Sequence, residues 1–268
     1  MSKYTGFSPY CATDKHMECY VVYLHNEGIK ADTIRSHLTA IGNKMKLKGL
    51  TPNTESFKLK KLITAYGRTD NPPAMRKPIT SRLLKNMLIS IRNSGRLEHT
   101  KKALASMFTV MYAGLLRVSE VSRAKGKANN HNIHKGNVTF NHKKREVIIK
   151  LDTYKFSKKP VTMAVTEKGD ISPYANLLQY DAMAGNRKWL YEDRNGKPYT
   201  QDSIRKMLAE VLEASGVKAM EYNTHSFRIG KATDMWRQGY TDMQICLAGR
   251  WNSKAFKKYI KPQILRFG

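Results

Sequence analysis

The proline-rich segment at residues 68–80, "RTDNPPAMRKPIT", constrains the architecture most strongly, because it separates helical patterns on its two sides. It holds three of the nine prolines and has no periodic apolar residues, as is typical of an interdomain linker. A chain of 268 residues is long enough for two modest domains. We therefore predict a boundary near residue 75, with one domain at 1–75 and another at 76–268.

The residues before this linker place apolar side chains at helical spacing, which predicts a small all-helical first domain. Breaks at glycine and proline separate the expected helices, which cover residues 14–27, 31–48 and 54–66.

The second domain shows two kinds of pattern. The strongly apolar segment "EHTKKALASMFTVMYAGLL" at 98–116 predicts a central core helix. Short runs of β-branched residues at 137–165 predict a small antiparallel sheet. Further helices are expected at about 81–93, 172–184, 200–215, 225–238, 241–248 and 253–260. The predicted fold is mainly α with a small antiparallel β-sheet: a helical domain followed by a mixed α/β domain.

The charge balance narrows the class of partner. Lys and Arg number 48 against 21 Asp and Glu, which gives a formal net charge of +27 and a pI near 10.0, so a polyanion is the expected partner. Three cysteines give no even disulfide framework and no zinc-finger spacing, which favours a reducing compartment. The sequence has neither a signal-peptide pattern nor an apolar run of about 18 residues. We expect a soluble intracellular protein that binds nucleic acid rather than membrane.

Two short motifs contain residues suited to phosphate chemistry. "MYAGLLRVSEV" places Arg117 and Glu120 just after the apolar helix, although a lone Arg there is more often a packing or capping residue. "THSFRIG" places His225 and Arg228 on one face at the start of a helix. A helix N-terminus favours anions, and Arg and His beside it form a phosphate cradle. The H-x-x-R pattern alone is common by chance.

A third motif, "LAGRWNSKAFKKYI", brings Trp251 and Tyr259 into a segment crowded with cations. Taken by itself, this tyrosine is an ordinary residue of an amphipathic core.

The order of these pieces resembles the tyrosine recombinase (phage-integrase-like) family, whose set is Arg, Lys, His-x-x-Arg, His or Trp, then a nucleophilic Tyr. "YAGLLRVSEV" is similar to the first family box, and "THSFRIGKAT" and "LAGRW" are similar to the second. The resemblance covers about residues 80–260. Because Tyr259 follows Trp251 by eight residues, the motif sequence is most similar to that of enzymes from eukaryotic mobile elements of the Crypton, DIRS and Ngaro kind. Many bacterial members have His in place of this Trp, and their Tyr follows it by nine residues.

The resemblance implies a site-specific DNA recombinase or integrase that cuts and rejoins DNA through a covalent 3′-phosphotyrosine, for integration or excision of a mobile element. We expect no cofactor, and because no Asp/Glu cluster of the two-metal kind stands out in the sequence, we predict no metal. The catalytic residues it implies, with Glu120 in support, are Arg117, Lys155, His225, Arg228, Trp251 and Tyr259. Lys155 is chosen because "DTYKFS" lies where the strand must reverse, and Lys150, Lys158 and Lys159 remain alternatives.

Physical chemistry gives each residue type a role. The planar forks of Arg117 and Arg228 suit the non-bridging oxygens of a phosphate. Tyr259 must react as a phenolate, which nearby cations favour. His225 can accept its proton or hydrogen-bond a phosphate oxygen. Trp251 has a single N–H donor and cannot shuttle protons.

The resemblance also implies that residues 1–75 form a core-binding domain, which closes a clamp around double-stranded DNA with the catalytic domain. The DNA-binding cations expected are Arg35, Lys44, Lys46, Lys48, Lys58, Lys60, Lys61, Arg250, Lys257 and Lys258. For each of those in the first domain, a solvated helix face is the alternative. The family implies a homo-oligomer, a dimer on one site and a tetramer in synapsis, and a nuclear location in a eukaryotic host.

Two other functions fit parts of the pattern. A type IB topoisomerase uses a similar residue set to relax supercoils without strand exchange. A domesticated transposon protein could bind DNA without cutting it, although the intact set from Arg117 to Tyr259 argues against this.

Overall fold

The computed structural model describes residues 12–70, 76–123, 132–153, 159–166, 171–251 and 257. The contacts divide the chain into two compact units, Met1–Ala74 and Met75–Gly268. The boundary expected from the linker composition lies one residue further along the chain.

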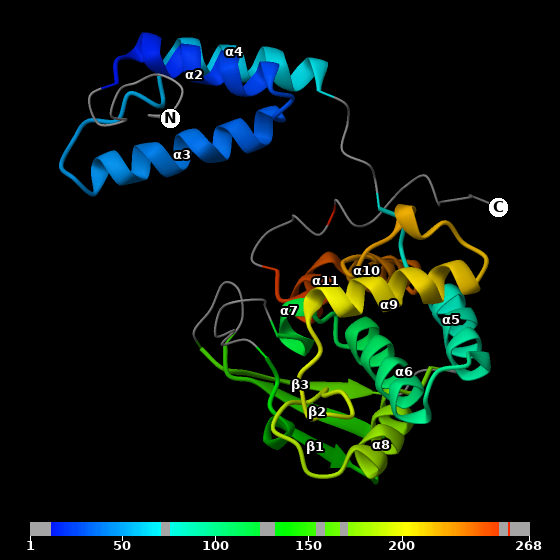
Figure 1. Ribbon diagram of the computed structural model, residues 1–268. Helices are drawn as coiled ribbons and strands as arrows, with labels where there is room; N and C mark the ends of the chain where they lie inside the picture. Colours follow the sequence, from blue (N-terminus) through cyan, green and yellow to red (C-terminus); the bar gives the residue numbers. More distant parts are fainter. Residues whose placement is uncertain are drawn as a thin grey trace. The chain divides into compact units, whose positions relative to one another are not determined.

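The first unit is helical, and Figure 1 draws it in blue and cyan. Its described helices are α2 (Asp14–Asn26), α3 (Ala31–Lys46) and α4 (Phe57–Thr69). The hydroxyl of Thr13 caps α2 by accepting the backbone N–H of His16. The helices share an apolar core that includes Met17, Val21, Ile34, Leu38, Leu59 and Ile63. The helical character predicted for this part of the chain is confirmed.

Helices also make up most of the second unit. They are α5 (Ser81–Asn93), α6 (Glu98–Ala113), α7 (Val118–Val121), α8 (Pro173–Ala184), α9 (Gln201–Ala214), α10 (Ser226–Arg237) and α11 (Asp242–Gly249), with 3-10 turns at Lys135–Asn137 and Ala219–Glu221. The apolar helix α6 is central, since it packs against α5, α8, α10 and the sheet (Figure 1). Of the helix expected at 253–260, only Lys257 lies among the described residues.

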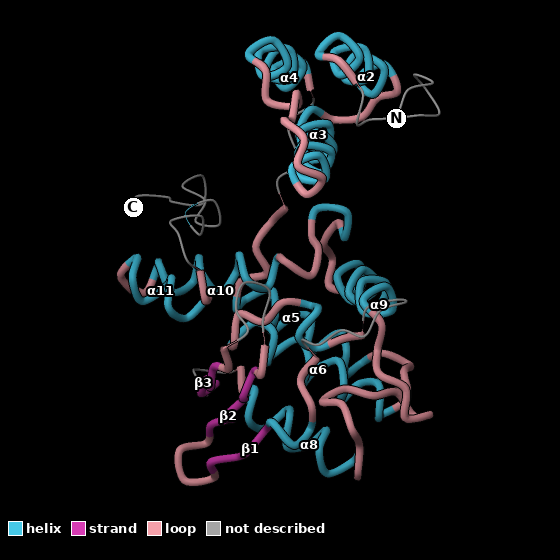
Figure 2. The backbone as a smooth tube through the Cα atoms, turned by 90° about the vertical axis from the view of Figure 1, so that its left-hand side faces the viewer, coloured by secondary structure: helices cyan, strands magenta, loops and turns pink. Residues whose placement is uncertain are grey.

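The sheet contains β1 (Val138–Asn141), β2 (Glu146–Leu151) and β3 (Val161–Thr166), paired antiparallel in that order. Along β2 the side chains of Val147, Ile149 and Leu151 are buried while their neighbours are more exposed, so one face turns to the core. Figure 2 shows the strands beside α8, which contacts β2 and β3. The predicted sheet, and with it the mixed α/β character of this unit, is confirmed.

The segment that precedes α5 lies against the start of α10. The N–H of Lys77 donates to the Glu221 carbonyl at 2.8 Å, and that of Ile79 donates to the Ser226 carbonyl at 3.0 Å. Further along α10, Gly230 lies directly beneath the backbone of Ile79, so close that a Cβ there would stand 1.7 Å from the Ile79 oxygen. The absence of a side chain at residue 230 is therefore what allows this segment to pack on α10.

Gly230→Ala is expected to lower the free energy of unfolding by about 3 kcal/mol, measured by urea denaturation. Alanine favours a helix over glycine by about 1 kcal/mol, but the clash with the Ile79 backbone outweighs that gain. Gly95→Ala is the matched control, because nothing lies within 4 Å of a Cβ at Gly95, and its effect should stay within about 0.5 kcal/mol. Equal stability of the two variants would contradict the close approach.

Candidate active site

Arg117 stands at a sharp turn between α6 and α7. Leu115 adopts a left-handed conformation with φ of 46°, which turns the chain after α6. Arg117 then caps α7, and its backbone N–H donates to Glu120 Oε2 at 2.9 Å. Its Nη1 pairs with Glu120 Oε1 at 3.2 Å. The Glu120 side chain is 1% exposed and that of Arg117 is 15% exposed, so the carboxylate holds the guanidinium from the protein interior.

Arg228 enters the same region from α10. It is fully buried, and its Nη1 donates to the Leu115 carbonyl while Nη2 donates to the Gly249 carbonyl at 2.8 Å. Leu115 is 113 residues earlier in the chain, so this side chain joins segments that are remote in sequence. His225 begins the same helix and is half-buried, and its backbone N–H donates to Asn223 Oδ1 at 2.9 Å.

Trp251 packs against the Arg228 guanidinium, with 4.8 Å between the guanidinium carbon and the ring centre. The chain reaches Trp251 through a turn that ends α11, where Arg250 takes a left-handed conformation with φ of 53°. The indole ring also covers Gly249, since a Cβ at that position would lie 2.0 Å from a ring carbon. Glycine at 249 thus allows the ring to approach both the backbone and Arg228.

Arg250 is buried, a placement that differs from the DNA-binding surface role expected of it. Its Nη2 pairs with Glu120 Oε2 at 2.9 Å, and its Nη1 donates to the Gly114 carbonyl at 3.3 Å. Its Nη1 also lies 3.7 Å from the sulfur of Met163 on β3. Sequence patterns could not reveal that Arg250 is buried, because they do not show which cation pairs with a buried carboxylate 130 residues away in the chain.

The helix that carries His225 and Arg228 is fixed at its other end by Asp234. This buried carboxylate accepts the N–H of Ser81 at 2.8 Å and the hydroxyl of Tyr112 at 2.5 Å. Burial raises the pKa of Tyr112 well above its usual value, and the nearby Asp234 charge adds to this. Tyr112 therefore remains a hydrogen-bond donor, and the network ties α5, α6 and α10 together.

Several expected site residues lie outside the described residues, namely Lys155, Lys158, Lys258 and Tyr259. Of the alternative hairpin lysines, Lys150 lies 3.6 Å from Asp152 and Lys159 is exposed. Lys257 is exposed and pairs with Asp242 at 3.0 Å. The structure therefore brings together Arg117, Glu120, Arg228 and Trp251, with His225 on the same helix as Arg228 and with Arg250 as an addition that the sequence did not place there.

The expected DNA-binding cations of the first unit are all exposed on or beside α3 and α4. Arg35 pairs with Asp32, and Lys46 with Glu55 at 3.2 Å. Lys61 lies over the ring of Phe57, with 5.3 Å to the ring centre. The others of this set are Lys44, Lys48, Lys58 and Lys60. Their exposure makes all seven side chains accessible to a phosphate backbone.

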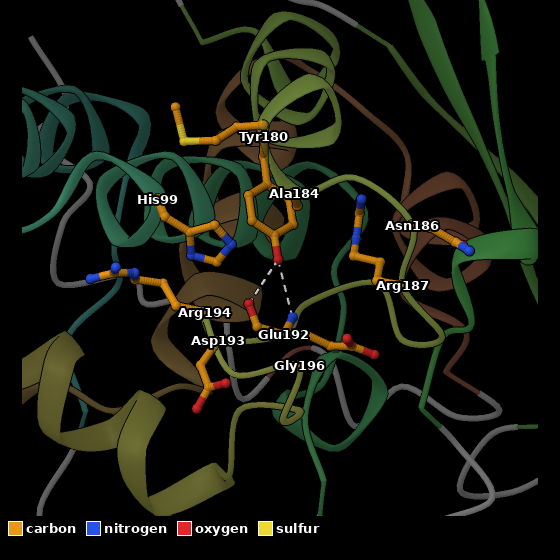
Figure 3. A pocket seen from close by; sticks show the side chains of 10 residues that line it. His99, Tyr180, Ala184, Asn186, Arg187, Glu192, Asp193, Arg194 and Gly196 are labelled. Atoms are coloured by element: carbon orange, nitrogen blue, oxygen red, sulfur yellow. Dashed lines mark hydrogen bonds between the residues drawn. The ribbon is translucent and has the colours of Figure 1, made fainter.

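A separate cavity of about 330 Å³ opens at the other end of α6 (Figure 3). His99 and Tyr180 face it, and the Tyr180 hydroxyl bonds both the carbonyl and the N–H of Glu192 at 3.0 Å. Burial lowers the pKa of His99 and favours its neutral form. A 16-residue helix extends roughly 24 Å, so this cavity is remote from Arg117, and no candidate active-site residue lines it.

The described residues contain no group of three or more His, Cys, Asp or Glu side chains arranged to hold a metal ion. Nor do they contain a helix with the length and apolar character needed to cross a membrane.

Comparison with known proteins gives one family match. The model of the phage integrase family matches residues 80–262. Comparison with curated proteins gives no match.

Among solved structures, the Tn1549 transposon integrase in complex with circular intermediate DNA is 12% identical, with a TM-score of 0.64 over 97% of this chain and 84% of that one. A lambda integrase dimer bound to a COC′ core site is 14% identical, with a TM-score of 0.62 over 97% and 67%. The XerH site-specific recombinase bound to its palindromic difH substrate is 11% identical, with a TM-score of 0.56 over 71% of this chain. This chain spans 51% of the XerH chain. At these identities the likeness establishes a shared fold.

Proposed function

This chain belongs to the phage integrase family, and we propose that it is a site-specific DNA recombinase or integrase that cuts and rejoins DNA through a covalent phosphotyrosine. The observation that carries the proposal is the convergence of Arg117, Arg228 and Trp251 on one turn. Arg228 bonds the carbonyl of Leu115, two residues before Arg117, and stacks on Trp251. Paired guanidinium groups beside an indole suit a phosphodiester, because each planar fork matches two phosphate oxygens.

In the proposed step, the phenolic oxygen of Tyr259 attacks the phosphorus and forms a tyrosine–phosphate bond, while the bond to the 5′-oxygen breaks. His225 accepts the phenolic proton, and Lys155 protonates the leaving 5′-oxygen. Arg117 and Arg228 neutralise charge that builds on the non-bridging oxygens, as a metal ion does in many other phosphoryl-transfer sites. Attack by a second 5′-hydroxyl on the 3′-phosphotyrosine reverses the step and joins the new strand.

Trp251 is assigned a positioning role in this site. Its N–H can donate to a phosphate oxygen, and its ring holds the Arg228 guanidinium at 4.8 Å. Glu120 supports Arg117 from the buried side through contacts at 2.9 and 3.2 Å.

We propose double-stranded DNA as the partner of both units. The net charge of +27 and the exposed cations of α3 and α4 support this. The solved relatives include a dimer on a core site and a transposon integrase with circular intermediate DNA. We accordingly propose a dimer on each site, a tetramer in synapsis and a role in moving a mobile element. The spacing of Trp251 and Tyr259 favours an element of the Crypton, DIRS or Ngaro kind, with action in the nucleus of a eukaryotic host.

The test begins with DNA selected by the protein from a random pool, where an inverted-repeat core is expected. A selected duplex is then nicked near the cleavage position, so that the released fragment diffuses away. The wild-type protein should become covalently joined to this DNA and resist denaturant, through a bond at the 3′-phosphate. Retention of DNA without such an adduct would instead indicate a non-catalytic binding protein.

A second assay separates a recombinase from a type IB topoisomerase. Incubation with two different duplexes that carry the selected site should give recombinant products. Relaxation of supercoiled DNA with no joining of different duplexes would assign the topoisomerase function instead.

A further inference from the structure

We propose that Arg250 is a positioning residue that orients Arg117 through Glu120, and that it does not contact DNA phosphates. The inference rests on the function proposed above, because it concerns how that site is assembled. It replaces the surface role expected for this cation.

Burial is the first observation. The Arg250 side chain is 5% exposed and that of Glu120 is 1% exposed. Burial alone does not exclude a phosphate contact, since Arg228 is also buried; Arg250 differs because its guanidinium pairs in addition with a buried carboxylate. Arg250 points inward, where Nη2 lies 2.9 Å from Glu120 Oε2 and 3.4 Å from the Leu115 carbonyl.

The shared carboxylate is the second observation. Glu120 Oε2 accepts both Arg250 Nη2 and the backbone N–H of Arg117, each at 2.9 Å. Its other oxygen accepts Arg117 Nη1 at 3.2 Å. Because the two oxygens belong to one rigid group, Arg250 fixes the direction in which Glu120 presents Oε1. Loss of Arg250 would leave the buried Glu120 carboxylate with less positive charge beside it, so the carboxylate would rotate toward Arg117.

The backbone supplies a third observation. Arg250 is in the left-handed region with φ of 53°, at a helix end where glycine or asparagine is the usual residue. An arginine there is strained unless its side chain makes compensating contacts. The contacts lead to Gly114 and Leu115, and Leu115 is itself left-handed with φ of 46°. Arg250 thus ties the turn before Trp251 to the turn before Arg117.

The test compares Arg250→Gln with the wild type in three measurements: thermal stability, DNA affinity as a function of salt, and single-turnover formation of the covalent adduct at saturating protein. A misplacement of about 1 Å in a reacting group can cost about 100-fold in rate. We expect adduct formation to slow by about this factor. Affinity and its salt dependence should match those of the wild type.

A phosphate contact predicts the opposite pattern. The slope of log affinity against log salt would then fall in magnitude by about 0.9, while saturating protein would restore the wild-type rate. Either that pattern or an unchanged rate with unchanged binding would overturn the proposal.

The route through Glu120 is tested by combining substitutions. Glu120→Gln should slow adduct formation, and Glu120→Gln with Arg250→Gln should be no slower than the slower single variant, because both act on one contact. If the rate losses of the two single variants multiply in the double variant, this route is wrong. Multiplied losses are the result expected when the two residues stabilise the fold independently. If Arg250→Gln does not fold, Arg250→Lys retains a cation beside Glu120. Arg250→Lys should form adduct more slowly than the wild type with an unchanged salt slope, and adduct formation at the wild-type rate would overturn the proposal.

Arg205→Gln is the matched control. Arg205 on α9 also pairs with a carboxylate, Asp202 at 2.8 Å, but its side chain is 53% exposed. This variant should retain the wild-type rate, affinity and salt slope. Adduct formation by the wild type, measured in parallel, separates a failure of the proposed function from a failure of the positioning role of Arg250. If the wild type forms none, the proposed function fails, and the salt slope still decides whether Arg250 contacts DNA.

Discussion

Tyr259→Phe is expected to abolish the covalent adduct while DNA affinity and thermal stability stay at the wild-type level. The substitution removes only the phenolic oxygen, and that oxygen is the atom proposed to bond to phosphorus. The proposed step has no second nucleophile, so the loss should exceed about 1,000-fold, as for removal of a nucleophile. The measurement is denaturing electrophoresis of the protein after incubation with the nicked substrate.

Tyr240→Phe serves as the matched control, since Tyr240 is a half-buried tyrosine that packs, like Trp251, against a small apolar cluster. It should form the adduct at close to the wild-type rate. If the Tyr259 variant still forms adduct, the nucleophile must be sought elsewhere, with Tyr240 and Tyr222 as the first candidates, and the proposed role of Tyr259 is wrong.

A sulfur substitution in the DNA separates the nucleophile from the general acid. A 5′-bridging phosphorothiolate provides a leaving group that needs no proton, so it should restore cleavage by Lys155→Ala and not by Tyr259→Phe. If Lys155→Ala cuts ordinary DNA normally while Lys158→Ala depends on the sulfur, the general acid is Lys158.

Local sequence pattern was sufficient to predict the fold class. Helical spacing predicted α2, α3 and α4, and β-branched runs predicted the sheet, because burial of one face imposes a period on the side chains. The apolar segment expected to be helical to residue 116 ends at Ala113 instead. The left-handed turn at Leu115 cannot be read from apolar spacing, since leucine usually continues a helix.

The candidate site could be predicted from the sequence only in part. Residue order predicted that Arg117, Arg228 and Trp251 act together, and the structure places them around one turn. The contact that joins Glu120 to Arg250 spans 130 residues and leaves no periodic signal in the chain. Arg250 was expected to bind DNA because it lies in a segment crowded with cations, and its burial becomes evident only through its carboxylate partner.

Arg228→Lys is expected to reduce adduct formation by about 1,000-fold, a loss comparable to removal of a principal transition-state donor. Lysine retains the positive charge, so attraction to DNA and its salt dependence should be nearly unchanged. Its three N–H donors share one nitrogen, however, and do not reproduce the planar fork whose two nitrogens bond the Leu115 and Gly249 carbonyls. Arg117→Lys should behave alike, since it loses the fork that Glu120 aligns at 3.2 Å.

The control for this pair is Arg237→Lys, on the last turn of the same helix α10, where the side chain is 38% exposed and lies 3.9 Å from Asp234. It should retain full activity. Rates at saturating protein, together with melting temperatures, separate lost chemistry from lost folding. Wild-type adduct formation by Arg228→Lys would remove Arg228 from the catalytic set and leave it a structural link between α10 and the turn at Leu115. A rate that fell only in parallel with DNA affinity would mean that the planar fork of Arg228 contributes to DNA binding and not to the chemical step.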